Sequence, residues 1–334
     1  MDKNDKKGVT RKEFLKLFGG SVAGAVVAGG LMASPLMGEE KKVKKILPVL
    51  KEAAEDRQPV IWFQGAGCTG CSVSLLNTVH PNIAEVLTKI ISLKAHPTLM
   101  AADGHLAMSV FEDAVEKKAG KYILVVEGAI PTAENGLYGT FGENSQGLPQ
   151  TILDWTKRLG QSAKAVVAVG TCAAFGGIPA AQPNLIGAKS VGEVLGKTVI
   201  NIPGCPPHPD WIVGTLAHVL LFGMPALDEL ARPKLFYKDV IHSNCPRYFD
   251  FEKQKYARQL GDDGCLVFLG CKGPIAHADC AKRHWNNGVN WCIGSRAPCI
   301  GCVQPEFPDQ LSPLYAKLPD EKIWLKSEEK LERR

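Results

Sequence analysis

The chain has 334 residues, of which 45% are hydrophobic and 22% charged, values typical of a globular protein with one large or two ordinary domains. The formal net charge is +5, but residues 1–33 hold six of the basic and three of the acidic side chains, which leaves 33 basic against 31 acidic side chains in the remainder. No basic stripe with interleaved aromatic residues occurs, so we expect no nucleic-acid partner.

The N-terminus predicts an export signal rather than part of the fold. A basic stretch precedes seventeen uncharged residues at 17–33, and five of these are glycine, so the segment is short and weakly apolar for a membrane-spanning helix. The sequence TRKEFLK is similar to the twin-arginine signal of proteins exported in folded form, with Lys12 where a second arginine is expected. We expect residues 1–38 to be this signal and residues 39–57 a linker, with an uncleaved anchor helix as the alternative.

Four short runs rich in Val and Ile predict strands that are buried on both faces of a parallel sheet. These runs are PVIWFQG at 59–65, KYILVVEG at 121–128, KAVVAVG at 164–170 and KTVINIPG at 197–204. Helical periodicity is found at 72–91, 107–118, 148–159 and 209–221. The alternation of strands and helices predicts a doubly wound α/β domain.

Chemically reactive side chains follow all four predicted strands. Cys68 and Cys71 come after the first, Glu127 ends the second, and Cys172 and Cys205 follow the third and fourth. Ligands of open α/β sheets bind beyond the carboxyl ends of the strands, so we expect the four thiols to converge there. The alternative is that Cys172 and Cys205 are small core residues, which is the usual role of a free cysteine.

After about residue 222 the sequence becomes rich in Pro, Gly and aromatic residues, and regular periodicity nearly vanishes. Seven cysteines fall within 58 residues: Cys245, Cys265, Cys271, Cys280, Cys292, Cys299 and Cys302. An irregular segment of this kind can be held together by bound metal clusters. Disulfides are disfavoured, because the eleven cysteines are an odd number in a large chain and most lie beside Gly or Pro.

Four thiolates at one site suit either zinc or an iron–sulfur cluster. Two CxxC pairs occur, but the other thiols are scattered along the chain, which favours the larger cluster over a structural zinc site. The seven C-terminal thiols lack one ligand for two sets of four, and His242, three residues before Cys245, can supply it. A zinc-stabilised binding protein without a redox role remains the alternative.

Eight motifs then resemble the small subunit of nickel–iron hydrogenases, in the order of that family and over roughly residues 58–315. They are GCTGCS, VEGAIPTAENG, VGTCAAFGGIPAA, PGCPPHPDW, IHSNCPRY, LGCKGP, DCAKRHWNNGVNWC and PCIGC. The resemblance implies a flavodoxin-like domain at 58–225, an irregular cluster domain at 226–315 and a tail at 316–334. It also implies that electrons pass through three iron–sulfur clusters between a nickel–iron centre in a separate large subunit and an external carrier, so that no catalytic residue lies in this chain.

The resemblance assigns a set of four ligands to each cluster. The proximal set is Cys68, Cys71, Cys172 and Cys205, the distal set is His242, Cys245, Cys265 and Cys271, and the medial set is Cys280, Cys292, Cys299 and Cys302. In many family members the medial cluster has three iron atoms and a proline stands at the position of Cys292. A cysteine at this position resembles the pattern of the nickel–iron–selenium subgroup. It predicts a medial 4Fe-4S cluster, with a 3Fe-4S cluster as the alternative if Cys292 is not a ligand.

Further expectations follow from the same resemblance. Glu127 should lie near the proximal cluster as a hydrogen-bond acceptor or occasional ligand, with a solvated loop carboxylate as the alternative. Gly70 and Gly177 stand where oxygen-tolerant members have extra cysteines, which predicts an oxygen-sensitive enzyme. The surface around Cys68–Leu76 and the loop at 173–181 should be buried against the large subunit.

The expected location is the periplasm, with membrane association as the alternative, and the expected electron carrier is a multihaem c-type cytochrome. A competing interpretation is a ferredoxin-like electron-transfer module or a complex I-type subunit that never meets hydrogen. Those subunits resemble the N-terminal domain alone, and the thiol-rich segment argues against them.

Overall fold

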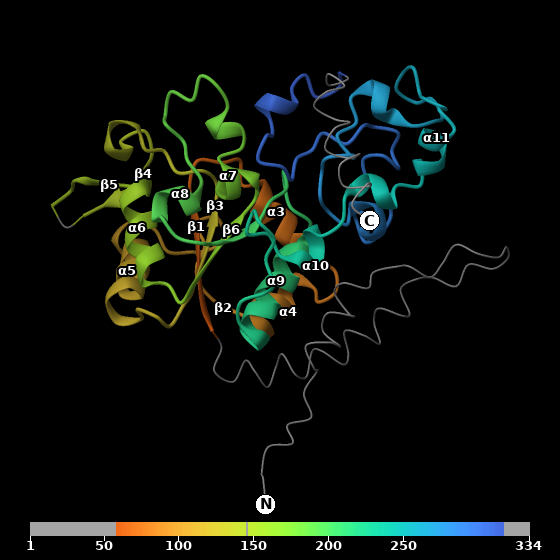
Figure 1. The fold of residues 1–334 in the computed structure, drawn as a ribbon. Coiled ribbons are helices and arrows are strands. Elements are labelled where there is room, and N and C mark those ends of the chain that lie inside the picture. The colour runs from red at the N-terminus through yellow and green to blue at the C-terminus, as the bar shows by residue number, and fades with distance from the viewer. Residues whose placement is uncertain (1–57, 145, 317–334) are drawn as a thin grey trace, which may run out of the picture.

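The computed structural model describes residues 58–144 and 146–316 (Figure 1). The predicted export signal, the linker and nearly all of the predicted tail lie outside these ranges. Within the described part of the chain, no helix is both long enough and apolar enough to cross a membrane.

A five-stranded parallel sheet forms the centre of the N-terminal half (Figure 1). Its strands, in spatial order, are β2 (Ser92–Ala95), β1 (Pro59–Gln64), β3 (Ile123–Glu127), β6 (Ala165–Val169) and β7 (Ile200–Ile202). Counted along the chain, this is the order 2-1-3-4-5 of flavodoxin-like folds, which confirms the predicted fold class. All four predicted strands are present. The edge strand β2 was not predicted, because its sequence SLKA is short and carries a lysine.

Each face of the sheet has its own apolar core, because successive side chains of a strand point to opposite faces. Val60 and Trp62 of β1 pack on the side of α3 (Gly70–Leu76) and α9 (Pro209–Phe222). Ile61 and Phe63 pack on the other side. That side is covered by α5 (Gly104–Lys117), α6 (Ile152–Ser162) and α8 (Val191–Leu195) (Figure 1).

The predicted helix at 72–91 is wrong. Helix α3 ends at Leu76, and the chain turns through Pro81 before α4 (Ile83–Glu85) and the π-helix η1 (Val86–Ile90). A proline inside a helix lacks the backbone N–H and clashes with the preceding turn, so it interrupts the apolar periodicity that predicted one continuous helix.

The helix predicted at 148–159 is present, but it begins at Ile152, four residues later than predicted. The first residues of the predicted range form β5 (Pro149–Thr151), which pairs antiparallel with β4 (Thr140–Glu143) in a hairpin. The hydroxyl of Thr151 accepts a hydrogen bond of 3.0 Å from the Asp154 amide, so Thr151 is the N-cap from which α6 begins. The predicted helices at 107–118 and 209–221 are confirmed as α5 and α9.

Short helical turns follow the strands and make up the C-terminal segment. After β3 and β6 come η2 (Ala133–Gly136), α7 (Thr171–Phe175) and η3 (Ile178–Ala180). Residues 223–316 contain α10 (Lys234–Tyr237), η4 (Ile241–Asn244), α11 (Tyr248–Glu252), η5 (Leu266–Leu269), α12 (Cys280–Arg283) and η6 (Asp309–Leu311). Strand pairing in this described segment is limited to isolated bridges, as the loss of periodicity predicts.

The C-terminal segment packs against the same face of the sheet as α9. Its residues Phe236, Ile241, Leu266 and Trp291 belong to the core that contains β1 and α9. Figure 1 shows this segment, blue toward its end, beside the green helix α9. The two parts of the chain therefore share one continuous apolar core.

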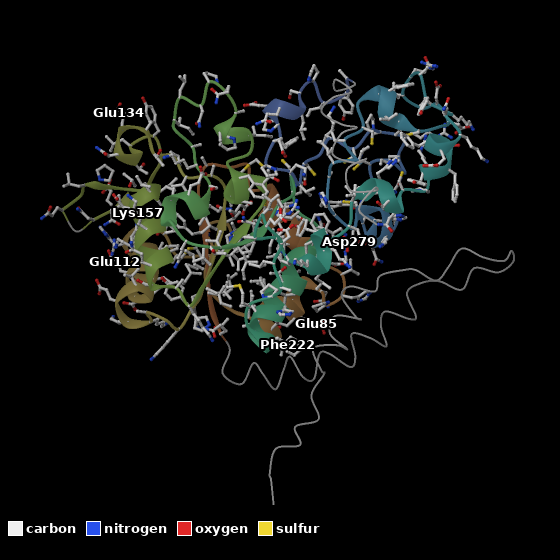
Figure 2. The ribbon with its side chains drawn as sticks, in the orientation of Figure 1. Glu85, Glu112, Glu134, Lys157, Phe222 and Asp279 are labelled. Atoms are coloured by element: carbon white, nitrogen blue, oxygen red, sulfur yellow. The ribbon has the colours of Figure 1, made fainter. Side chains whose placement is uncertain are left out.

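A buried ion-pair network joins the two parts. Arg283 of α12 contacts Asp210 of α9 at 2.7 Å and Asp279 at 2.6 Å. The indole of Trp211 donates to Asp279 at 2.7 Å. Figure 2 labels Asp279, the residue of the C-terminal segment that Trp211 of α9 reaches. The network anchors the start of α12, where Cys280 lies, to the sheet domain.

Candidate metal-cluster sites

The four thiols predicted as proximal ligands converge at the carboxyl ends of β1, β6 and β7. Burial raises the pKa of the Cys71 thiol far above its usual range, and the charges of Glu127, Cys172, Cys68 and Cys205 raise it further. Burial also raises the pKa of Cys172 to about 11, with the charges of Cys205 and Cys68 acting in the same direction. Because each thiolate is destabilised by the others, a bound cation or cationic cluster is what such a group requires.

Three glycines bring the backbone close to these thiols. Gly170 has a φ of 91°, and a Cβ atom there would lie 2.5 Å from the Cys71 sulfur. A Cβ at Gly177 would lie 3.1 Å from the Cys172 sulfur, and one at Gly70 would lie 3.1 Å from the Cys68 sulfur. The two positions that the sequence singled out, Gly70 and Gly177, therefore both lie directly beside predicted proximal ligands.

The carboxylate of Glu127 is buried, so the alternative of a solvated loop carboxylate is wrong. One oxygen accepts from the backbone amides of Cys71 at 2.9 Å and Ser72 at 3.1 Å. The other accepts from the indole of Trp62 at 3.0 Å, from Gln64 at 3.2 Å and from the Ser72 hydroxyl. The carboxylate thus fixes the first turn of α3, which carries Cys71.

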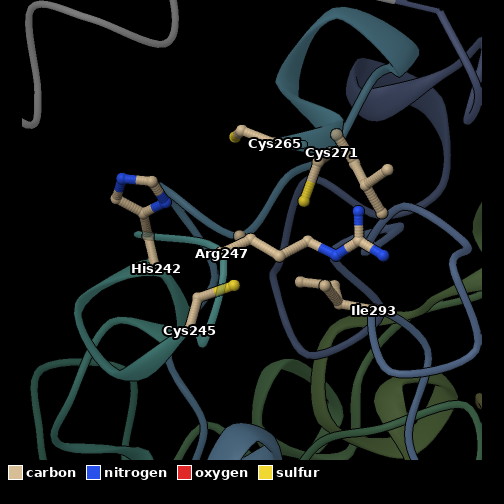
Figure 3. A pocket seen from close by; sticks show the side chains of 8 residues that line it. His242, Cys245, Arg247, Cys265, Cys271 and Ile293 are labelled. Carbon is tan, nitrogen blue, oxygen red and sulfur yellow. The ribbon is translucent and has the colours of Figure 1, made fainter. Parts of the chain in front are cut away.

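The four side chains predicted as distal ligands line one pocket (Figure 3). Its lining consists of His242, Cys245, Arg247, Cys265, Leu266, Cys271, Gly273 and Ile293. Figure 3 shows the three thiols and the imidazole around a common space, with the Arg247 side chain crossing it. Burial raises the pKa of Cys245, and the charge of Cys265 adds to this effect while Arg247 opposes it.

His242 contributes a neutral ring to this pocket. Burial lowers the pKa of His242 below its ordinary value, and the charge of Glu252 acts in the opposite direction. The ring contacts Tyr248 and Phe251, with centroid distances of 5.2 Å and 4.8 Å. A neutral imidazole has a free nitrogen lone pair, which is the form that can bind a metal.

The four thiols predicted as medial ligands also form one group. Burial raises the pKa of Cys280 well above its ordinary value, and the charges of Cys302, Asp279 and Cys292 raise it further. The pKa of Cys299 is raised by burial and by Cys271, Cys302 and Cys292. Cys292 itself is exposed, yet its charge acts on the other three thiols, so it lies at the rim of their group.

Direct contacts join the three groups in one sequence. Burial raises the pKa of the medial Cys302 to about 12, and a hydrogen bond from the backbone of the proximal Cys205 opposes that rise. Burial likewise raises the pKa of the distal Cys271 to about 12, opposed by hydrogen bonds from the backbone at Gly273 and at the medial Cys299. The medial group therefore lies between the other two.

The donor set fits iron–sulfur clusters. All eleven cysteines are free, and with His242 they form three groups of four, the ligand number of a 4Fe-4S cluster. Among residues 58–144 and 146–316, no three His, Cys, Asp or Glu side chains are arranged around a single metal ion. A cluster distributes its ligands over several iron atoms, so its thiolates lie farther apart than the ligands of one ion.

Comparison with known proteins agrees with the resemblance of the sequence. Residues 68–219 match the family described as the 20 kDa subunit of NADH ubiquinone oxidoreductase. Residues 237–315 match the family described as the C-terminal part of the NiFe and NiFeSe hydrogenase small subunit. The second match covers the segment that a complex I-type subunit would lack.

Relatives extend over nearly the whole chain. The periplasmic NiFeSe hydrogenase small subunit of Desulfomicrobium baculatum is 46% identical over 323 residues, which cover 92% of this chain and 98% of that protein. The periplasmic NiFe hydrogenase small subunit of Solidesulfovibrio fructosivorans is 40% identical over 313 residues, 92% of this chain and 93% of that protein.

A solved structure shows the same fold. The reduced, active form of the Ni-Fe-Se hydrogenase from Desulfomicrobium baculatum matches with a TM-score of 0.76 and 49% identity, covering 78% of this chain and 100% of that one. The chain belongs to the family of nickel–iron hydrogenase small subunits. The enzyme class is therefore hydrogenase, as the sequence motifs predicted.

Sequence reasoning missed the residues that connect the groups. Thr171 precedes Cys172 and is buried, and its hydroxyl contacts the backbone of Cys302. Lys272 follows Cys271 and is also buried, and its amide donates to the Cys299 carbonyl at 2.7 Å. Their position next to predicted ligands was the available signal, but their partners lie far away in the sequence.

Proposed function

We propose that this chain relays electrons through three 4Fe-4S clusters between the active site of a hydrogenase large subunit and an external carrier. The proximal ligands are Cys68, Cys71, Cys172 and Cys205, the medial ligands are Cys280, Cys292, Cys299 and Cys302, and the distal ligands are His242, Cys245, Cys265 and Cys271. Bound clusters supply one-electron chemistry over a wide range of potentials. The nickel–iron centre belongs to the partner.

One observation carries this proposal: the three groups of four ligands touch in the order proximal, medial, distal. Cys205 and Cys302 connect the first pair of groups, and Cys271 and Cys299 connect the second. Structural metal sites need not lie near one another, whereas electron transfer between centres by tunnelling requires a short distance between them. The order also agrees with the resemblance to the family.

A surface for the large subunit surrounds the proximal group. Val73 is 54% exposed and Ile178 is 55% exposed, and each lies within a few residues of a predicted proximal ligand. Apolar side chains exposed beside a functional site indicate a protein contact. We infer that these two surfaces, around Cys68–Leu76 and 173–181, are buried in the heterodimer.

Purification of the complex tests the proposal. The chain should co-purify with a large subunit that contains nickel, and the iron and sulfide contents should correspond to three clusters on this chain. Val73→Glu should abolish co-purification, while the control Val289→Glu, at an exposed valine of the C-terminal segment, should not. An isolated chain that is monomeric, stable and fully loaded contradicts the heterodimer.

The medial cluster is the second point to test. The charge of Cys292 acts on the other three medial thiols, which supports a fourth ligand and a 4Fe-4S cluster. Electron paramagnetic resonance of the oxidised enzyme should show no three-iron signal in the wild type. That signal should appear in Cys292→Pro, because the iron without a ligand becomes labile. A strong three-iron signal in undamaged wild-type enzyme contradicts the assignment and leaves a 3Fe-4S cluster.

The proximal cluster should be of the ordinary, oxygen-sensitive type. Gly70 and Gly177 provide no sulfur at the two positions beside Cys68 and Cys172. Activity should therefore be lost under air, and sustained turnover in air would count against this proposal. Glu127 serves here as the acceptor that holds the Cys71 amide.

We further infer a periplasmic location, with residues 1–38 as a twin-arginine-like signal, 58–225 and 226–315 as the two domains, and a multihaem c-type cytochrome as the carrier at His242. The relatives named above are described as periplasmic, which supports this location. Cell fractionation of Arg11→Ala should show the complex retained inside the cell. Unchanged export would contradict the predicted signal.

A further inference from the structure

Thr171 occupies the junction between the proximal and medial groups. It lies between β6 and Cys172, its residue is 1% exposed, and it begins α7. Its backbone amide donates to the carbonyl of Gly204 at 3.0 Å, and its hydroxyl accepts from the amide of Gly204 at 2.9 Å. This reciprocal pair ties the loop of Cys172 to the loop of Cys205.

The same hydroxyl reaches the medial group. It donates its proton to the backbone carbonyl of Cys302, a residue 131 positions away in the sequence. Both hydrogen-bonding functions of the hydroxyl are therefore used, one toward a proximal loop and one toward a medial ligand. Only serine or threonine can donate and accept through one side-chain atom at this position, and valine has the same shape without either function.

We propose that Thr171 is a positioning residue that holds Cys302 against Cys205 and so fixes the path of electrons from the proximal to the medial group. In this step one electron leaves the proximal site and enters the medial site, with no bond broken and no proton moved. The inference rests on the proposed function, because it takes these cysteines as cluster ligands.

The consequence for the medial site is a lower potential once the hydroxyl is lost. Without the bond from Thr171, Cys302 is free to move away from Cys205. The Cys302 sulfur then loses the hydrogen bond that the backbone of Cys205 donates to it. Hydrogen bonds to cluster sulfurs favour the reduced, more negative state, so their loss lowers the potential. Electron transfer also slows, because tunnelling across a gap decays more steeply than tunnelling through a hydrogen bond.

A matched set of variants tests this in the loaded heterodimer. Thr171→Val removes the hydroxyl and keeps the shape, and Thr171→Ser keeps the hydroxyl. The control is Thr156→Val, since Thr156 is buried in α6 and its hydroxyl donates only within that helix, to the Ile152 carbonyl at 2.7 Å. Iron content and the visible spectrum establish that each variant is fully loaded.

Two measurements then decide the proposal. The first is a redox titration followed by electron paramagnetic resonance. In Thr171→Val, the ratio of reduced to oxidised medial cluster at a fixed potential should be about fivefold lower than in the wild type. This change corresponds to the net free energy of one ordinary hydrogen bond. Light-triggered electron injection should show slower transfer from the proximal to the medial cluster. Thr171→Ser and Thr156→Val should match the wild type in both measurements.

Wild-type behaviour of Thr171→Val in both measurements would overturn the proposal. If Thr171→Val fails to assemble, Thr171→Ala and Thr171→Ser, both smaller than threonine, replace it: a defect in the alanine variant alone supports the proposal, and equal behaviour contradicts it. Failure of the proposed function is a separate result, because it would show as fewer than three clusters in the wild-type spectra.

Discussion

The sheet domain and the C-terminal segment hold their thiols in opposite ways. In the sheet domain, parallel ladders and two apolar cores fix the strands, and the cysteines are placed at strand ends by that frame. In residues 223–316 the described structure has only short helical turns and isolated bridges. Here Cys271, Cys280 and Cys299 lie within the apolar core that the segment shares with the sheet domain, and short turns rather than strand ends carry them.

The burial of the thiols sharpens this contrast. Cys280 and Cys299 are buried, and burial raises the pKa of both well above the ordinary value. Without metal these side chains are neutral thiols, and a cluster binds thiolates, so metal binding and folding of the segment are coupled. The sheet domain has no such dependence, because its strands are held by backbone hydrogen bonds and apolar side chains.

Removal of iron should give the largest effect. Chelation under anaerobic, reducing conditions should make the backbone amides at 226–315 exchange rapidly, while β1, β3 and β6 remain protected. In small zinc domains the metal contributes about 10–16 kcal/mol of folding free energy, so loss of two clusters is enough to unfold an irregular segment. Hydrogen exchange by mass spectrometry measures both regions in one sample. Equal protection of both regions after iron removal would contradict the comparison.

The same contrast explains what the sequence alone could predict. The strands β1, β3, β6 and β7 were predictable because unbroken Val/Ile runs are a local signal of a doubly buried strand. The thiols were predictable because residue type and spacing carry their chemistry. The contact of Thr171 with Cys302 was not, since no local pattern encodes a partner 131 positions away.

The errors of prediction have a similar cause. The periodicity at 72–91 ran through Pro81 because apolar spacing continued on both sides of the turn. The strand β2 owes its existence to pairing with β1 rather than to its own four residues. The first error is local, because the proline signal was outweighed by the apolar spacing. In the second, tertiary pairing outweighs local propensity.

Loss of the ion pairs between the two regions should give the next largest effect. Arg283→Met leaves Asp279 without its partner at 2.6 Å in a largely buried site, which should cost about 3 kcal/mol, the lower end for a broken buried pair because Asp210 stays partly exposed. Thermal loss of the visible iron–sulfur absorption measures the change. The control is Lys117→Met, which breaks an exposed pair with Asp113 and should leave the transition unchanged. Equal thermal transition temperatures for Arg283→Met and Lys117→Met would show that the ion-pair network does not stabilise the contact between the two regions.

The same small substitution in each region should give different results. Ile200→Val in β7 and Ile293→Val beside the distal pocket each remove one buried methylene, worth about 1 kcal/mol. Ile200→Val should destabilise the chain with and without iron, as measured by denaturant unfolding. Ile293→Val should do so only in the loaded enzyme, because the metal-free segment is already unfolded. An effect of Ile293→Val in the metal-free protein would show that the core shared with the sheet domain keeps the segment folded without metal.

The smallest effect that we expect is a pH dependence of stability at the contact between α9 and the C-terminal segment, where His208 lies. His208 caps α9 and its Nε2 contacts the carbonyl of His284 at 2.7 Å, while its Nδ1 accepts from the Asp210 amide at 3.1 Å, which fixes the neutral ring with the proton on Nε2. Burial lowers the pKa of His208, with Asp210 and Asp279 opposing this shift and Arg283 adding to it.

Because the pKa of His208 is lowered in the folded state, the neutral ring contributes stability at pH values above its pKa in the unfolded chain, about 6.5. This contribution is lost as the pH falls through the pKa of the folded state. The loss is about 1.4 kcal/mol for each unit by which the pKa is lowered. His208→Gln should therefore narrow the difference in thermal stability between pH 7.5 and pH 5.5, measured on the loaded heterodimer. Other buried histidines, such as His96, titrate in both proteins and cancel in the comparison. If wild type and His208→Gln lose the same stability over this range, the protonation of His208 is not what loosens the joint at low pH.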